Sequence, residues 1–330
     1  MEYLQKEEKD MNNVLASLIK YPFSGKARSY IKKAYRDYKF SKEKLIMTLV
    51  VKNEEDIVEQ NIRFHCAMGA DGFIVTSHNC TDNTNAILDN LKKEGLVLDV
   101  IYQTGEKHQL NVWVNQMIKL ATKKYGATWM INADADEFYY SKSLNLKQSI
   151  QKCSAGIANV LWVDALFLFP DNRDNFLECP FFVTSPFTQF MAEQLNIYNI
   201  PKFKPFIGSQ GCTKVIHKTS DHPKAQKGNH TIIIKNKVSI EAADIKLFHY
   251  HIKNYKGYEN KVKRWKEAIK YKPEGESEHL KKMISLYDKG DLYNDYCDTY
   301  NENMRNFLME YGVVTRDLSV SNFLHYKGII

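Results

Sequence analysis

The residues best suited to chemistry lie in one short segment, Asp134-Ala135-Asp136-Glu137. Its three carboxylates repel one another, so the arrangement is costly unless a cation neutralises them. Hard oxygen ligands at this density suit Mg²⁺ or Mn²⁺, with water and a diphosphate completing the coordination. The segment therefore predicts a divalent metal site at Asp134 and Asp136. An Asp-x-Asp pair alone is a common pattern, so the prediction depends on the elements that position it.

The chain before the acidic segment alternates between apolar strands and helices. This alternation predicts an α/β fold, with a mostly parallel, Rossmann-like sheet flanked by helices and connected by right-handed crossovers. Such sheets bind ligands at the carboxyl ends of their strands, where the polar segments 53–56, 77–82 and 134–137 fall. The acidic segment therefore follows a fourth strand, at the ligand-binding edge. The expected strands are 45–51, 72–76, 97–102 and 129–132, and the expected helices are 57–68, 84–94 and 109–125.

Four motifs follow one another in this part of the chain. They are Lys52-Asn53-Glu54-Glu55, the loop Ser77-His78-Asn79-Cys80-Thr81-Asp82-Asn83-Thr84, the pair Gln109…Trp113, and Trp129…Asp134-Ala135-Asp136-Glu137-Phe138. Together they resemble family 2 glycosyltransferases of the GT-A fold, in particular the subgroup whose second motif ends in Asp-x-Asp-Glu-Phe. The resemblance covers residues 45–140 well and 210–265 loosely. It implies a metal-dependent hexosyltransferase that moves a sugar from a nucleotide-sugar donor to a glycan or lipid-linked acceptor.

The resemblance also implies which residues hold the donor. Asp136 would carry the metal that binds the donor diphosphate, and Asp134 would lie near the ribose or the metal. Asp82 would hold the second polar loop or cap the helix that begins near Thr84. Many relatives have an aspartate where this chain has Ser77, so the base is open, and uridine is expected because it is frequent in the family. The residues expected around the nucleotide sugar are Val51, Asn53, Glu54, Ser77, Asp82, Gln109, Asp134, Ala135, Lys214 and His230, the last two lining the donor or acceptor pocket.

Two further roles require residues well after the acidic segment. GT-A enzymes often take another metal ligand from a histidine in this region, and His249 in Phe248-His249-Tyr250-His251 is the candidate, with a structural role as the alternative. Inverting transfer, which is typical of the family, needs a general base that deprotonates the acceptor hydroxyl. Asp164, Glu193 and Asp221 are candidates, and nothing in the sequence selects one.

Charge and hydropathy bear on where the protein acts. The 46 Lys and Arg residues exceed the 39 Asp and Glu residues, which gives a net charge of +7. Basic and aromatic residues are mixed at 17–44 and 253–272, a pattern that suits either an anionic membrane surface or a solvated helix face. No apolar run approaches the roughly 20 residues of a membrane-spanning helix, and the charged first residues do not resemble a signal peptide. We therefore expect a cytoplasmic protein, peripheral on the inner face of the membrane.

We expect three regions along the chain. Residues 1–44 form a basic amphipathic helical extension, 45–265 a GT-A domain, and 266–330 a helical C-terminal extension. Within the domain, residues 45–140 bind the nucleotide and 141–265 the acceptor. The expected role is surface polysaccharide or lipo-oligosaccharide synthesis, and the alternatives are a catalytically inactive relative or a basic protein that binds a membrane or nucleic-acid surface. A nucleic-acid partner is not expected, because a phosphate-binding surface would avoid the acidic segment.

Overall fold

The computed structural model describes the unit Lys44–Ile330 apart from short gaps. Apart from its last two residues, the predicted extension 1–44 lies outside the described residues. In the part of the chain that the structure describes, no helix combines the length and the hydrophobicity that a membrane-spanning helix needs. The described residues are 43–105, 109–195, 207, 212–220, 222–226, 229–269 and 278–330.

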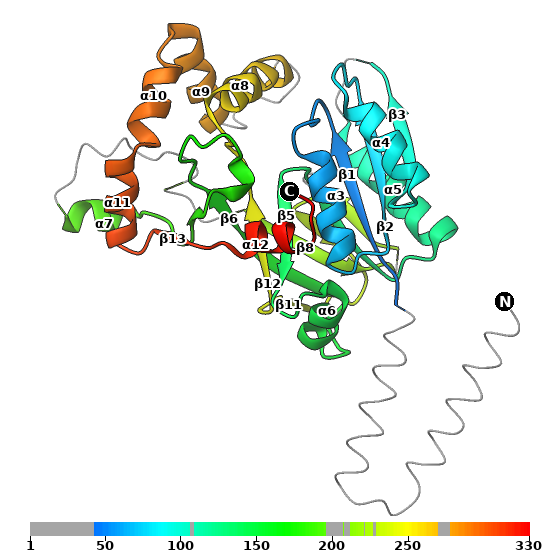
Figure 1. Ribbon diagram of the computed structural model, residues 1–330. Helices are drawn as coiled ribbons and strands as arrows, with labels where there is room; N and C mark the ends of the chain where they lie inside the picture. The colour runs from blue at the N-terminus through cyan, green and yellow to red at the C-terminus, as the bar shows by residue number, and fades with distance from the viewer. Residues whose placement is uncertain are drawn as a thin grey trace, which may run out of the picture. The chain divides into compact units, whose positions relative to one another are not determined.

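The first half of the unit is the predicted parallel sheet with its crossover helices. Its elements are β1 (Leu45–Val51), α3 (Val58–Ala67), β2 (Gly72–His78), α4 (Thr84–Lys93), β3 (Val97–Gln103), α5 (Leu110–Tyr125) and β4 (Trp129–Ala133). Strand β1 lies between β2 and β4, β3 pairs with the other side of β2, and all three pairings are parallel. Figure 1 shows α3, α4 and α5 alongside these strands. Because helices cover the sheet, β1 and β2 are buried along almost their whole length. The predicted α/β fold is confirmed.

Beyond β4 the sheet contains antiparallel as well as parallel pairs. The elements are β5 (Glu137–Ser141), α6 (Leu146–Ser154), β6 (Val160–Leu168), η1 (Phe176–Glu178), β7 (Phe181–Val183), α7 (Gln189–Gln194), β8 (Thr213–Lys218), β9 (Lys224–Gln226), β10 (Thr231–Ile233), β11 (Ser239–Glu241) and β12 (Ile245–His249). Strand β8 pairs antiparallel with both β4 and β6, so β6 runs in the same direction as β1 and β4. Strand β12 is antiparallel to β5 and parallel to β6. The carboxyl ends of β1, β4, β6 and β12 therefore point the same way.

The C-terminal region is helical, as predicted, and packs onto the second half of the sheet. Its elements are α8 (Tyr255–Ile269), α9 (Glu278–Lys289), α10 (Leu292–Thr299), α11 (Glu302–Glu310), β13 (Val314–Arg316) and α12 (Ser319–Tyr326). Phe169 and Val183 from the sheet region share one hydrophobic cluster with Val262, Met283 and Leu308 from the helices. The boundary expected after residue 265 lies within α8, and residues on both sides of it contribute to this core. Burying these side chains together stabilises the position of α8 relative to the sheet.

A buried histidine joins α3 to the sheet. His65 is fully buried, and its Nε2 accepts a hydrogen bond of 2.9 Å from the backbone N–H of Tyr139. Because that backbone group can only donate, Nδ1 carries the ring proton and donates it to the carbonyl oxygen of Asn61 at 2.8 Å. Burial lowers the pKa of His65 to about 3, although the hydrogen bond to Asn61 opposes the change. The imidazole is therefore neutral in the folded protein.

This histidine predicts a loss of stability in mild acid. In the unfolded chain His65 takes up a proton below pH ~6.5, whereas the folded protein resists protonation until about pH 3. The stability it confers is therefore complete above pH ~6.5 and is lost as the pH falls, by up to about 1.4 kcal/mol per pH unit. We expect His65→Gln to have a shallower dependence of unfolding free energy on pH between 6 and 4, by about one proton, in urea titrations. An unchanged dependence would contradict the assignment of a neutral His65.

Candidate active site

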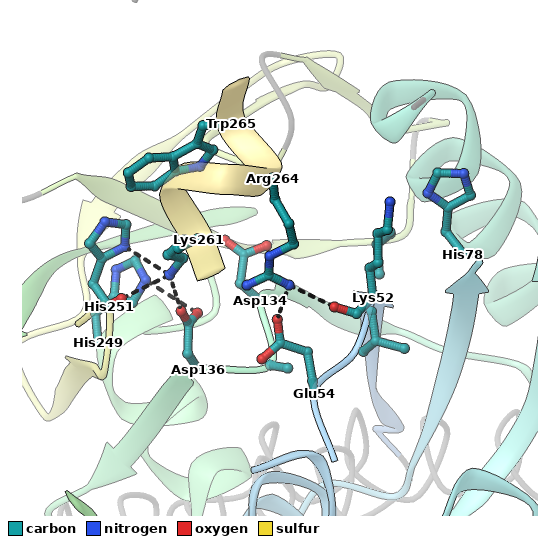
Figure 2. Close-up of a pocket in the computed structure, with 13 residues that line it drawn as sticks. Lys52, Glu54, His78, Asp134, Asp136, His249, His251, Lys261, Arg264 and Trp265 are labelled. Atoms are coloured by element: carbon teal, nitrogen blue, oxygen red, sulfur yellow. Dashed lines mark hydrogen bonds and ion pairs between the residues drawn. The ribbon is translucent and has the colours of Figure 1, made fainter. Parts of the chain in front are cut away.

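Two adjoining cavities open at the carboxyl ends of β1, β2 and β4. The smaller cavity, of about 300 Å³, is lined by the β4–β5 turn, the end of β12 and helix α8, as Figure 2 shows. The larger cavity, of about 600 Å³, follows the loop after β1 and the start of α8. Both volumes are typical of ligand sites. The residues common to the two cavities are Glu54, Asp136, His251, Lys261 and Arg264.

Strand pairing brings two distant segments together at the acidic turn. The register of β5 and β12 places His249 opposite Glu137, and the N–H of Tyr250 donates to the carbonyl oxygen of Asp136 at 2.8 Å. Side chains alternate along an extended chain, so His249 and His251 project to the same side. Figure 2 shows both imidazole rings beside the Asp136 carboxylate. The end of β12 therefore delivers two ring nitrogens to the carboxylate that follows β4.

Asp136, His249 and His251 have the geometry of a candidate metal site. One ligand atom from each residue lies within 4.8 Å of the others, and Nε2 of His249 is 3.2 Å from Oδ1 of Asp136. Burial would raise the pKa of Asp136, but Lys261 and His249 outweigh it and hold that pKa well below its ordinary value. Burial would lower the pKa of His249, but Asp136 raises it to about 10. One carboxylate and two imidazoles suit Mn²⁺ better than Mg²⁺, which prefers oxygen ligands.

Asp134, the other predicted metal ligand, has different partners. The ammonium group of Lys214 is 2.9 Å from Oδ2 of Asp134 and 2.8 Å from Oε1 of Glu137. The amide of Asn229 accepts a hydrogen bond from Lys214 and donates one to Asp134 at 3.1 Å. Burial would lower the pKa of Lys214, but the two carboxylates raise it above its ordinary value. Asp134 and Glu137 therefore share a counter-charge from a lysine of the chain itself, although their density in the sequence pointed to a metal ion.

Helix α3 fixes the backbone of the same turn. The buried side-chain amide of Asn61 donates to the carbonyl oxygens of Ala135, at 2.9 Å, and Glu137, at 2.7 Å. One helical turn later, His65 accepts the N–H of Tyr139. These bonds pair backbone groups that the turn would otherwise leave buried without partners. They hold the segment in the conformation that directs Asp136 into the smaller cavity.

Helix α8 and the residues before it bring positive charge to the loop after β1. The ammonium group of Lys253 is 2.7 Å from Asp56 and 3.4 Å from Glu54. Arg264 donates to the carbonyl oxygen of Lys52 at 2.7 Å and lies 3.3 Å from Glu54, as drawn in Figure 2. The basic cluster that the sequence assigned to a membrane or solvated surface therefore supplies side chains to the cavities.

Several residues predicted to surround the nucleotide sugar line a cavity. They are Val51, Glu54, Asp134 and Ala135 in the smaller cavity, and Asn53 and Asp82 in the larger one. The carboxylate of Asp82 accepts the N–H of Thr84 at 3.0 Å, where α4 begins, and the N–H of Glu55 at 3.2 Å. Asp82 therefore binds the first N–H group of α4 and also links the loop after β2 to the loop after β1.

Three other predicted residues, Ser77, Gln109 and His230, are not part of the lining of the two cavities. The hydroxyl of Ser77 donates to the side chain of Asn85 at 2.6 Å and is buried. Gln109 is exposed at the residue before α5. Nδ1 of His230 lies 3.3 Å from the carbonyl oxygen of Thr213. None of the three lines either cavity.

Two of the three predicted candidates for the general base, Asp164 and Glu193, are not at these two cavities. Asp164 is exposed on β6 and accepts a hydrogen bond from the hydroxyl of Thr213. Glu193 is exposed on α7, and Asp221 lies outside the described residues. Neither Asp164 nor Glu193 lines either of the two cavities described above.

Sequence reasoning missed several residues that the structure places at the site. His251 could have been identified, because alternation after the apolar strand puts it on the same side as His249. Nothing in the sequence distinguishes Lys261 and Arg264 from the other basic residues near them, because only tertiary packing brings α8 to the cavity. Asn61 was missed because its role is to bond to the backbone, which leaves no pattern in the sequence.

A family match identifies the chain. Residues 48–290, more than two thirds of the sequence, match the model of glycosyltransferase family 92. The chain belongs to glycosyltransferase family 92. The predicted glycosyltransferase activity is therefore confirmed, whereas membership of family 2 and of its Asp-x-Asp-Glu-Phe subgroup is not. No curated protein matches the chain in sequence.

Solved structures show a weak likeness to this family 92 glycosyltransferase. Residues 1–349 of S. aureus TarS are 12% identical with a TM-score of 0.36, over 77% of this chain and 72% of that one. The same fragment in complex with UDP is 11% identical with a TM-score of 0.36, over 81% and 75%. Glucosyl-3-phosphoglycerate synthase from Mycobacterium tuberculosis, in complex with Mn²⁺, UDP and phosphoglyceric acid, is 12% identical with a TM-score of 0.29, over 56% and 59%. These TM-scores are low, so the assignment to family 92 rests on the match of residues 48–290 to the family model.

The buried position of Lys214 predicts a large and specific stability effect. We expect Lys214→Met to lower the free energy of unfolding by about 3–5 kcal/mol, because it leaves the fully buried carboxylate of Glu137 without its ammonium partner. Lys147→Met, which removes the partly exposed ion pair with Asp71, should cost only about 0–1 kcal/mol. Adding Glu137→Gln to Lys214→Met should recover part of the loss. Urea unfolding of the four proteins measures these differences, and equal costs at Lys214 and Lys147 would contradict the assignment.

Proposed function

We propose that this family 92 glycosyltransferase uses a nucleotide-sugar donor and holds the donor diphosphate with a divalent metal ion at Asp136, His249 and His251. The observation that supports this proposal is the convergence of one carboxylate and two imidazoles in a cavity at the carboxyl edge of the sheet. Mn²⁺ is the first candidate because it accepts imidazole ligands as well as carboxylates. When bound, the ion would stabilise the negative charge that develops on the departing diphosphate.

The smaller cavity is the proposed donor site. Glu54 from the loop after β1 and His78 from the end of β2 form the wall at which a nucleoside would lie. The ring of His78 packs against Trp113 with centroids 4.7 Å apart, and its Nε2 is 2.9 Å from the carbonyl oxygen of Gly105, so this wall is held in place. UDP is the first nucleotide to test, because uridine is frequent in the enzymes whose motifs the chain resembles.

The larger cavity is the proposed acceptor site. Amide and charged side chains line it, which suits the hydroxyl groups of a glycan or of the sugar on a lipid-linked acceptor, as surface polysaccharide or lipo-oligosaccharide synthesis requires. Inverting transfer needs a general base, and Glu55 and Asp56 line this cavity. Asp56 is the first choice, because its side chain is 52% exposed and the ammonium group of Lys253, 2.7 Å away, holds it in position. A product that keeps the donor's anomeric configuration, observed by NMR, would contradict inversion.

The metal assignment predicts how UDP binding depends on Mn²⁺. We expect the wild-type protein to bind UDP more tightly with Mn²⁺ than without it, and Asp136→Asn to lose that difference together with turnover. Asparagine keeps the size of the side chain and removes the charge that would hold the ion. Isothermal titration measures both affinities, with GDP and CDP as alternative nucleotides.

Asp99→Ala is the matched control, because Asp99 forms surface ion pairs with Lys92 and Lys124. It should bind UDP with the wild-type Mn²⁺ dependence. If Asp136→Asn keeps the wild-type Mn²⁺ dependence of UDP binding, the metal lies elsewhere. If none of the three nucleotides binds, the proposal that the donor is a nucleotide sugar is contradicted.

We also propose that the enzyme attaches peripherally to an anionic membrane through an apolar and basic patch. Ile157, Val238 and Ile240 expose 71%, 40% and 38% of their surface. Lys235 and Lys237 are exposed in the loop between β10 and β11, which also contains Val238. Apolar side chains that enter the interface, with lysines that meet anionic headgroups, are the features of such a surface.

The position of this patch leaves the cavities accessible. The carbonyl oxygen of Val238 accepts the N–H groups of Asn159 and Val160, which places the loop at the amino end of β6. The amino end of β1 points the same way, and the basic residues of segment 17–44 immediately precede β1 in the sequence. The cavities lie at the opposite, carboxyl ends of the strands.

Vesicle binding tests the patch. We expect the wild-type protein to sediment with vesicles of phosphatidylcholine and phosphatidylglycerol, and the triple variant Ile157→Ser, Val238→Ser, Ile240→Ser to lose most of this binding. Phe190→Ser is the control, because Phe190 is 68% exposed on α7, outside the patch. Equal sedimentation of the triple variant and the wild type would contradict the assignment of this surface.

A further inference from the structure

The ammonium group of Lys261 lies within the proposed metal site. Its Nζ is 2.8 Å from Oδ2 of Asp136, 2.9 Å from the carbonyl oxygen of His251 and 3.3 Å from Nδ1 of the same histidine. Figure 2 shows it beside the carboxylate and the two imidazole rings. The Lys261 side chain is only 18% exposed, so water screens this contact in part. Lys261 therefore supplies a positive charge where a metal ion would meet Asp136.

A metal ion and this ammonium group would compete for the same atoms. The ligand atoms of Asp136, His249 and His251 lie within 4.8 Å of one another, and Lys261 already contacts two of these residues. Two cations a few Å apart repel each other strongly in partly buried surroundings. The ammonium group must leave Asp136 when the ion binds, and breaking that contact lowers the affinity for the ion.

We propose that Lys261 is an internal competitor for the metal and thereby couples metal binding to donor binding. The inference rests on the proposed function. Without a nucleotide, Lys261 neutralises Asp136 and the metal binds weakly. A bound diphosphate offers the ammonium group a new anionic partner and frees Asp136 for the metal. Metal and nucleotide then strengthen each other's binding by the same factor.

The other lysines near the cavities have different partners. Lys214 is buried between Asp134 and Glu137, and Lys253 binds Asp56 and Glu54. Lys266, on the same helix as Lys261, pairs with Asp288 at 2.6 Å and lines neither cavity. Lys266 therefore provides a matched control for removing a charge from α8.

Mn²⁺ titration of the full chain without nucleotide tests the inference. Free Mn²⁺ is measured by electron paramagnetic resonance. We expect Lys261→Met to bind Mn²⁺ about tenfold more tightly than the wild type, which lies within the range of measured coupling between sites. Lys261→Arg keeps the competing charge and should bind as weakly as the wild type, and Lys266→Met should also match the wild type. UDP should increase Mn²⁺ affinity by a larger factor in the wild type than in Lys261→Met.

The outcomes separate this inference from the proposed function. Melting temperatures establish that each variant is folded, and Lys261→Gln replaces Lys261→Met if the latter is not. If the uncharged variants bind Mn²⁺ no more tightly than the wild type, the inference is overturned. The proposed function still stands in that case, provided that the wild type binds Mn²⁺ together with UDP. Absence of Mn²⁺ binding in every protein, with and without UDP, overturns the proposed function and this inference with it.

Discussion

The buried ammonium group of Lys214 is the interaction on which the geometry of the site depends. It contacts Asp134 and Glu137 at 2.9 and 2.8 Å, and its own side chain has no exposure to solvent. A buried carboxylate without a counter-charge costs several kcal/mol, so Glu137, which has no exposure to solvent, depends on the lysine that β8 supplies. With Asp134 and Glu137 balanced in this way, Asp136 faces the two histidines of the β12 end.

Besides the imidazole of His249, two lysines in different surroundings balance the acidic segment. The side chain of Lys214 is fully buried, so its contacts can change only if the surrounding structure unfolds locally. The ammonium group of Lys261 is partly exposed and lies at the end of a flexible side chain. It can therefore exchange Asp136 for another partner at a smaller free-energy cost than Lys214 would need to leave its own partners. This difference suits the proposed division of the segment, in which Asp134 and Glu137 fix the turn and Asp136 binds the metal ion. Two of the charges that pointed to a metal in the sequence, Asp134 and Glu137, are thus held by a lysine of the fold.

The sequence predicted those features that local patterns encode. Continuous apolar runs such as Leu45–Val51 located the parallel strands, and the acidic segment at the end of the fourth strand located one wall of the site. The other wall depends on contacts between residues far apart in the chain, such as Asp136 with Lys261, which are 125 positions apart. Nor could the sequence show that Asp164 and Glu193 lie away from the cavities, because strand register and helix packing decide where such acids point.

Anomalous diffraction from crystals grown with Mn²⁺ and UDP tests the central claim most directly, because it locates the ion independently of activity. The account predicts one Mn²⁺ bound by the carboxylate of Asp136 and by ring nitrogens of His249 and His251, in contact with the diphosphate, with the ammonium group of Lys261 withdrawn from Asp136. An ion bound elsewhere, for example at Asp134 alone, would contradict it. So would UDP bound in the cavity without an ion while Lys261 remains on Asp136.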